Sequence, residues 1–471
     1  MSTSPLNRTL LIFSCIGCAV LGYVLGGLEK TPGAPSSAVP EVALSDRGRG
    51  EDGDDLVDEA RHALRQAWAG HDAQIREALD PSGNRSALRA RLDEALASAD
   101  GAGLAALGQD LFLRDLSGWA AHARPPRRVH RGDEGGPDAD RCASCHWKPV
   151  MGGGAGLVDM AFMDGDGETL ESSLPRNAPA LHGSAVIAAL AAEMTRDLQG
   201  QASRAVAEAK TSGGAVESSL STHGVAFGRV VARQDGSVDR SGVEGVAQDL
   251  VVRPFGWKGH FATLREATVS ALHLELGLVP SDLGESGVAA LIAHMASLPV
   301  PTVIPPERSD QMARWERGQG RFESAGCAHC HVPSMRLLDP MLALDSEGRV
   351  QINVADLAGL ERDPSGEGYR VWLYSDLKRH SLGDLLSEGR PHGAVAGDVF
   401  RTPPLWGIDG TSPYLHDGRA LDEFAAAIFA HGGEARSARD AYRGMNDVER
   451  AELRAFLRGF TRDPRIRVAG P

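Results

Sequence analysis

The sequence predicts a mainly α-helical protein with a few short β-hairpins, and three observations lead to this fold class. Apolar residues recur at helical spacing among strong helix formers, most clearly over 56–121. Gly-punctuated alternation over 204–253 predicts short strands or hairpins there. The chain also has 56 glycines and only 5% aromatic residues, which is typical of a loop-rich protein. Its length of 471 residues predicts two or three domains.

Two copies of one cysteine motif organise the chain. Cys142–His146 reads CASCH and Cys327–His331 reads CAHCH, so both follow the pattern C-x-x-C-H. Two thiols at this spacing form thioethers with the two vinyl groups of a haem, and the histidine that follows becomes the proximal iron ligand. We therefore expect two covalently bound haem c groups, each in a cytochrome c-like domain. The residues expected to hold them are Cys142, Cys145, His146, Cys327, Cys330 and His331.

Three other interpretations of the cysteines are weaker. A thioredoxin-like redox pair needs a βαβ context, and neither motif follows a buried apolar strand. Zinc binding by four thiols and two histidines does not require a histidine directly after each second cysteine. A disulfide across C-x-x-C closes a very small loop and stabilises little.

The N-terminus predicts export. Thr9–Leu28 is an almost unbroken apolar run without a charged residue, which indicates a signal peptide or a membrane anchor. We favour an anchor in the inner membrane formed by residues 9–28, with the body of the chain in the periplasm or cell envelope. The two cysteines outside the motifs, Cys15 and Cys18, lie in this run.

Composition shifts and Pro-rich stretches suggest the domain boundaries. The Pro-rich stretch PVPTVIPP at 299–306 is typical of a linker. The expected parts are a signal peptide or anchor at 1–30, a disordered linker at 31–54, a helical N-terminal module at 55–123, a first cytochrome c-like haem domain at 124–300 and a second at 308–471.

The charge balance bears on partners. The net charge is −14 and the chain has no basic runs, which argues against nucleic-acid binding. An acidic surface suits a basic electron donor, although a solvated acidic surface is the ordinary explanation.

Several segments around the motifs resemble a known family. FGWKGHFATLREA at 255–267 lies between the motifs, and FRTPPLWG at 400–407, PYLHDGRA at 413–420 and HGGEA at 431–435 follow the second one. Together with the two motifs, they resemble the diheme oxidoreductase (thiol oxidoreductase) family, which is related to the bacterial diheme cytochrome c peroxidases. The resemblance covers roughly 125–470 and implies a peroxidase-like oxidoreductase.

The resemblance also implies roles for single residues. Glu275 is similar to the acid that faces the peroxide site, and Trp257 to the tryptophan between the two haems. His431 lies where the family has the distal ligand of the electron-accepting haem. Arg176 and Asn177 resemble a segment whose asparagine helps to hold one calcium ion. The distal histidine of the first haem has no clear match; Met160, Met163 and His182 fall in that region.

The expected reaction follows from these roles. Electrons from a donor cytochrome or cupredoxin enter at the second haem and pass by Trp257 to the first haem. There hydrogen peroxide or a related small oxidant is reduced with help from Glu275. Two alternatives stay open: a non-catalytic electron carrier with both irons six-coordinate, and a haem-dependent oxidase of a partner protein.

Overall fold

The structure is a computed structural model. It describes residues 85–121, 136–148, 151–156, 159–301, 303, 305–358, 360–421 and 424–460. These residues belong to one compact unit, Leu79–Ile466. The apolar segment at 9–28 and the linker at 31–54 lie outside the described residues. Within the described ranges, no helix is both long enough and apolar enough to cross a bilayer.

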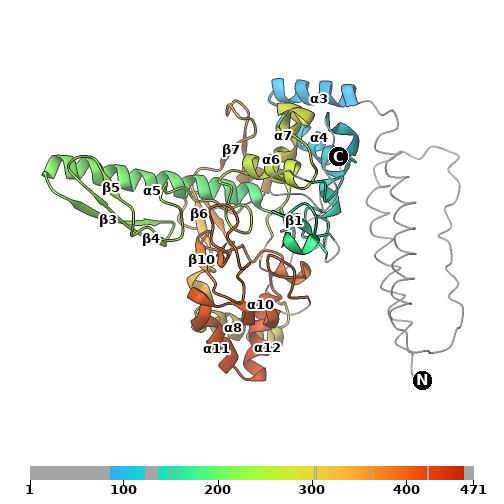
Figure 1. The fold of residues 1–471 in the computed structure, drawn as a ribbon. Helices are drawn as coiled ribbons and strands as arrows, with labels where there is room; N and C mark the ends of the chain where they lie inside the picture. Colours follow the sequence, from blue (N-terminus) through green and yellow to red (C-terminus); the bar gives the residue numbers. More distant parts are fainter. Residues whose placement is uncertain are drawn as a thin grey trace, which may run out of the picture. The chain divides into compact units, whose positions relative to one another are not determined.

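Helices dominate the described residues, as the sequence predicts (Figure 1). They are α3 (Arg85–Ala97), α4 (Gly101–Leu113), α5 (Ser184–Ser212), α6 (Leu264–Leu274), α7 (Pro280–Ser297), α8 (Ser309–Ser324), α9 (Val354–Ala358), α10 (Phe424–Ala430), α11 (Arg436–Gly444) and α12 (Asp447–Leu457).

The strands are short and form small antiparallel sheets, which confirms the predicted hairpins. β3 (Val216–Thr222), β4 (Val225–Ala232) and β5 (Val238–Asp239) form a three-stranded sheet. The remaining pairs are β1 (Ala161–Met163) with β2 (Leu174–Arg176), β6 (Met335–Leu337) with β9 (Tyr369–Val371), β7 (Met341–Ala343) with β8 (Gln351–Asn353), and β10 (Arg379–Ser381) with β11 (Val399–Arg401).

Helix α5 is longer than the sequence pattern indicates. The alternation over 204–253 predicts strands from its start, but α5 continues to Ser212 and the strands occupy only 216–239. Ala205 and Ala209 are four apart, so they lie on one face of the helix, where they pack against Ala232 of β4. This contact with the sheet favours helix over strand. Figure 1 shows α5 running alongside β3, β4 and β5.

Helices α4 and α7 pack very closely. Asp100 caps α4 by accepting a hydrogen bond from the backbone N–H of Gly103. A Cβ on Gly108 would overlap the backbone carbonyl of Ala290 in α7, so only glycine allows this approach. Phe112 of α4 and His294 of α7 lie in ring contact, with centroids 5.1 Å apart.

Helix α6 begins with a capping box. The side chain of Thr263 accepts from the backbone of Glu266, whose carboxylate accepts from the backbone of Thr263. The helix ends at Leu274, with Glu275 as its C-cap residue. Both ends of α6 are therefore set by local hydrogen bonds, and they determine where Glu275 lies.

Helices α8 and α12 pack against each other in the C-terminal part of the chain, around an aromatic cluster. Phe322, Tyr374, Phe456 and Phe460 are buried together, and the rings of Tyr374 and Phe460 meet edge to face at 4.4 Å between centroids. Burying each such ring stabilises the fold by about 1.5–3 kcal/mol. The cluster packs against Cys327, so it supports the second motif directly.

The largest apolar cluster extends from Leu88 in α3 to Trp406, and it includes residues of α5, α7 and β6. The cluster thus contains residues of the predicted helical N-terminal module and of both predicted haem domains. The exact domain boundaries stay a prediction.

Candidate functional site

Both cysteine motifs open into one cavity of about 1000 Å³. Its lining is mainly apolar with a few polar groups, which is usual for a cofactor site. The motif residues in its wall are Cys142, Cys145, His146, Cys327, Cys330 and His331. A chain segment of almost two hundred residues separates the motifs in sequence, and the fold brings them to one space.

The side chain of His146 is oriented by backbone carbonyls. Its Nδ1 lies 3.0 Å from the carbonyl oxygen of Pro179 and 3.2 Å from that of Gly153. Burial lowers the pKa of His146 to about 4, so the imidazole is neutral near pH 7. A neutral ring whose Nδ1–H donates to a carbonyl leaves Nε2 as the nitrogen for a metal.

His331 is held in the same way. Its Nδ1 lies 3.0 Å from the carbonyl oxygen of Tyr374, and burial lowers its pKa to about 4. The residue before each histidine is a cysteine at the end of a short 3₁₀ turn, Cys142–Ser144 in one motif and Cys327–His329 in the other. Both motifs therefore present two thiols and an Nε2 atom from one compact turn.

The buried surroundings of the thiols do not suit a redox pair. None of the four motif cysteines is in a disulfide. Burial raises the pKa of Cys142 to about 12 and that of Cys327 to about 11, and it also raises the pKa of Cys145. A thioredoxin-like pair needs a lowered thiol pKa, because the thiolate is the nucleophile.

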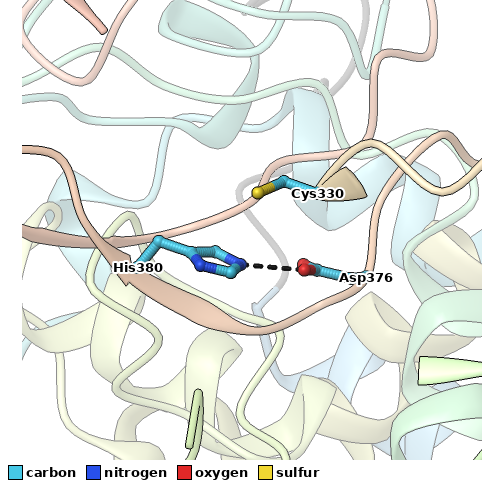
Figure 2. Close-up of side chains that lie close together, drawn as sticks. All are labelled: Cys330, Asp376 and His380. Atoms are coloured by element: carbon cyan, nitrogen blue, oxygen red, sulfur yellow. Dashed lines mark hydrogen bonds and ion pairs between the residues drawn. The ribbon is translucent and has the colours of Figure 1, made fainter. Parts of the chain in front are cut away.

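A zinc site has little support. Within the described ranges, the side chains close enough to share an ion are Cys330, Asp376 and His380 (Figure 2). The ring nitrogens of His380 already lie 2.8 Å from Asp376 and 2.8 Å from Glu434. Burial alone would lower the pKa of His380, but hydrogen bonds to Asp376, Cys330 and Glu434 outweigh it and raise the pKa to about 11. A protonated imidazole has no lone pair for a metal.

His431 shares the cavity with His331. It follows α10, and its Nδ1 lies 2.8 Å from the carbonyl oxygen of Ala427. Nε2 is again the nitrogen left to face the cavity. The two histidines are close enough that the charge of His431 contributes to the lowered pKa of His331, although burial is the larger cause.

Glu275 lies beside the first motif. Its backbone carbonyl accepts hydrogen bonds from the N–H groups of Asp138, at 2.7 Å, and Ala139, at 3.1 Å. The half-buried carboxylate is in the cavity wall. After burial, its negative charge is the next cause of the raised pKa of Cys145. The structure thus brings Glu275 together with the first motif.

Trp257 connects two backbone segments of the cavity wall. Its indole Nε1–H donates to the carbonyl oxygen of Asn177 at 2.7 Å, and its own carbonyl accepts from the N–H of Arg401 at 3.0 Å. The side chain is half-buried and lines the cavity. Of the residues near the first motif, His182 and Met163 also line this cavity, and His182 is buried.

Asn177 presents a buried oxygen that suits a cation. Its Nδ2 donates to the carbonyl oxygen of Pro413 at 2.6 Å. Its Oδ1 is buried and has no hydrogen-bond partner among the residues that the structure describes. An unpaired buried carbonyl oxygen is costly unless a water or an ion binds to it.

A buried ion-pair cluster, here called the Glu388 cluster, was not anticipated from the sequence. Glu388 lies 2.5 Å from Arg176, 3.2 Å from Lys258 and 3.6 Å from His416, and all four side chains are at most 9% exposed. Burial alone would raise the pKa of Glu388, but the charges of Arg176 and Lys258 outweigh it and lower the pKa. The resemblance singled out Arg176, and two of its segments contain Lys258 and His416, but no pattern in the sequence pointed to Glu388.

The cavity wall holds more buried positive than negative charge near the Glu388 cluster. Arg176, Lys258 and Arg401 are all buried and line the cavity. Burial lowers the pKa of Arg401 to about 10, which still leaves it protonated. One carboxylate, Glu388, pairs with two of these cations, so the wall suits a ligand with negative groups. The propionates of haem are such groups.

Part of the chain matches a known family. Residues 289–460 match a family described as "Di-haem oxidoreductase, putative peroxidase". Among solved structures, the chain is similar to a MauG-like protein associated with microbial copper homeostasis, at 17% identity and a TM-score of 0.30, over 50% of this chain and 79% of that one. No curated protein matches. The resemblance read from the sequence is confirmed over residues 289–460, which contain Cys327–His331 and His431.

Proposed function

We propose that this chain, whose residues 289–460 match the di-haem oxidoreductase family, is a diheme c-type oxidoreductase that reduces peroxide. The observation that carries the proposal is the matched pair of histidines, His146 and His331. Each follows two cysteines, each donates Nδ1–H to a carbonyl, and both line one cavity. That arrangement fits a haem at each motif.

The chain would hold each haem by covalent bonds and by charge. The S–H bonds of Cys142 and Cys145, and of Cys327 and Cys330, would add across the vinyl groups and form thioethers. The haem iron supplies one-electron redox chemistry and a coordination position for the oxidant. Arg401, which has no carboxylate within ion-pair distance among the described residues, offers a positive charge for a propionate.

The cavity wall offers a different side chain near each motif, and this difference supports different roles for the two haems. His431 offers a second strong nitrogen ligand near His331, so the second haem would serve electron transfer. Near the first motif the wall offers the carboxylate of Glu275. That carboxylate takes a proton from the near oxygen of peroxide and returns it to the leaving oxygen. Two electrons and two protons convert one peroxide into two waters.

The proposal also includes an electron route, a calcium site and a cellular location. Electrons enter at the second haem from a donor cytochrome or cupredoxin and reach the first haem past Trp257. Asn177 Oδ1 would be one ligand of a calcium ion. The chain works in the periplasm or cell envelope, anchored in the inner membrane by residues 9–28. The orphaned oxygen of Asn177 supports the calcium assignment, and the acidic net charge suits a basic donor.

Electron paramagnetic resonance of the haem-loaded protein tests the proposal. Spectra are recorded for the oxidised protein and for the half-reduced protein, before and after addition of hydrogen peroxide. We expect a high-spin ferric signal at one haem that peroxide removes, in at least one of the two states. Two low-spin signals that ignore peroxide in both states would overturn the proposal and leave an electron carrier.

A further inference from the structure

Helix α4 reaches the first motif through one aromatic ring. The ring centroid of Phe112 lies 6.3 Å from that of His146, and Phe112 also lines the cavity. Gly108 lies one helical turn before Phe112 and therefore on the same face, where α4 meets the backbone of α7. Phe112 thus belongs to the first site, although α4 precedes the predicted start of the first haem domain at residue 124.

Helix α8 reaches the second motif in the same manner. The ring centroids of Phe322 and His331 lie 6.4 Å apart. Gly318 again lies one turn before the phenylalanine, and a Cβ on it would overlap the backbone carbonyl of Glu452 in α12. The helix pairs α4–α7 and α8–α12 are therefore two copies of one arrangement, each with a Gly-x-x-x-Phe pattern beside a C-x-x-C-H motif.

The two copies differ in the chain between helix and motif. Helix α8 ends directly before the second motif, whereas residues 114–141, here called the extra segment, separate α4 from the first motif. The structure describes its two ends, 114–121 and 136–141. The N–H of Leu116 donates to the carbonyl oxygen of Asp140 at 2.8 Å, so the extra segment returns to the helix that it leaves.

The returning end of the extra segment is bound to the C-terminal end of α6. The N–H of Gly136 donates to the carbonyl oxygen of His273 at 3.0 Å. The N–H groups of Asp138 and Ala139 donate to the carbonyl oxygen of Glu275. A Cβ on Gly136 would lie only 2.6 Å from that same oxygen, so glycine is needed for this approach. The extra segment therefore holds the backbone of Glu275 directly.

Asp138 fixes the extra segment from the other side. Its buried carboxylate accepts a hydrogen bond from the N–H of Phe162 in β1, at 2.7 Å. The next residue of β1, Met163, lines the cavity. The extra segment is thus bound to two parts of the cavity wall, β1 and the end of α6, directly before the first motif.

We infer that the extra segment positions Glu275 in the first haem site. The inference rests on the proposed haem at the first motif and on the proposed role of Glu275. A carboxylate that moves a proton must stay within hydrogen-bond reach of the oxidant, and a displacement of about 1 Å can cost about 10²-fold in rate. Gly136 and Asp138 are positioning residues, because they act through Glu275. The second copy has no such segment, which agrees with its proposed role in electron transfer.

The reduction potential of the first haem tests this positioning without peroxide. A carboxylate near an iron stabilises the ferric form, so Glu275→Gln should raise the potential. Gly136→Ala should also shift it, because the added methyl group displaces the end of α6. In the double variant Gly136→Ala should add no further shift, since the charge that it displaces is already gone. Spectroelectrochemical titration of the haem-loaded full chain compares the wild type with the three variants.

Gly118→Ala is the matched control. It adds the same methyl group to the same extra segment, at a position with open space around it. It should leave the potential and the kcat for peroxide at their wild-type values. In Gly136→Ala the kcat should fall by about 10²-fold while both haems stay attached. The pyridine haemochrome spectrum counts the haems in each variant.

Two results would overturn the inference: a wild-type potential in Gly136→Ala, or a shift of the same size with and without the Glu275 carboxylate. If Gly136→Ala does not attach both haems, amide hydrogen exchange of the wild type decides. Slow exchange at Gly136, Asp138 and Ala139 supports the inference, and fast exchange at all three rejects it. A wild type that ignores peroxide while the potentials behave as expected would refute the proposed function only.

Discussion

His431 and His331 line one cavity, and the Nδ1 of each ring lies within hydrogen-bond distance of a backbone carbonyl oxygen, 2.8 Å for His431 and 3.0 Å for His331. Nε2 is therefore the free coordinating nitrogen of both rings. Two such rings on one iron give a six-coordinate, low-spin haem that transfers electrons and binds no oxidant.

Replacing His431 tests this arrangement. His431→Ala should convert the second haem from a low-spin to a high-spin ferric signal, because its sixth ligand is lost. Electron paramagnetic resonance and the visible absorbance bands report the change. His329→Ala, at an exposed variable position inside the second C-x-x-C-H motif, is the control and should leave both signals as they are. Unchanged low-spin signals in His431→Ala would assign the sixth ligand to another residue.

Glu275 should matter for turnover and little for folding. Its backbone carbonyl holds Asp138 and Ala139 whatever the side chain is. Glu275→Gln removes the proton-transferring group and keeps the size, so kcat for peroxide should fall by about 10²–10⁴-fold. Glu171→Gln, at an exposed acid, should retain wild-type kcat. Steady-state kinetics with a reduced donor gives both numbers, and a loss of less than twofold would remove Glu275 from the mechanism.

The Glu388 cluster should contribute strongly to stability. Glu388→Gln leaves Arg176 and Lys258 buried without a counter-ion, which should lower the free energy of unfolding by about 3–5 kcal/mol. Arg196→Gln breaks an exposed ion pair with Asp339, with side chains 58% and 50% exposed, and should cost at most about 1 kcal/mol. Urea unfolding of the haem-loaded protein compares the two variants. Equal losses would show that the cluster contributes little.

His380 should make stability depend on pH. Its folded pKa of about 11 is above that of a free histidine, so its charged form stabilises the fold fully below about pH 6.5, and this contribution is lost as pH rises toward 11. The difference in unfolding free energy between wild type and His380→Gln should shrink between pH 6 and pH 10. Glu434→Gln removes one partner of the ring and should reduce that change. A difference that stays constant across this range would contradict the ion-paired imidazole.

Calcium should stabilise the protein through Asn177. The Tm should rise on addition of calcium and fall with a chelator, because an ion that binds only the native state stabilises it by about 2.7 kcal/mol at 100 times its Kd. Asn177→Ala should abolish this response, and Asn177→Asp, which keeps an oxygen and adds charge, should preserve it. Differential scanning fluorimetry provides the measurement. A wild-type Tm that ignores calcium would rule out the calcium site.

Sequence patterns served best where the interactions are local. The capping box of Thr263 and Glu266 joins residues three apart, so the start of α6 depends on local sequence. The pattern failed at 204–212, which is helical because Ala205 and Ala209 pack against Ala232 of a distant strand. Alternation over a few positions contains no information about that partner.

The residues of the candidate site also fall into those that local sequence predicts and those that only the fold brings together. The motif residues could be named from spacing, since a C-x-x-C-H turn places two thiols and one imidazole on one side of a short loop whatever surrounds it. The resemblance supplied Glu275, Trp257 and His431, and all three line the cavity. Glu388 and Lys258 escaped notice, because a buried charge is recognised only by the opposite charge that the fold places beside it.

The sequence by itself determined the two C-x-x-C-H turns, the helical class and the resemblance to the diheme family, all of which depend on neighbours in the chain or on local pattern. The tertiary structure decided that His146 and His331 share one cavity, that Pro179 and Tyr374 orient them, and that Glu388 lies among Arg176, Lys258 and His416. These relationships join residues far apart in sequence. They arise from the packing of non-local segments, which no spacing rule encodes.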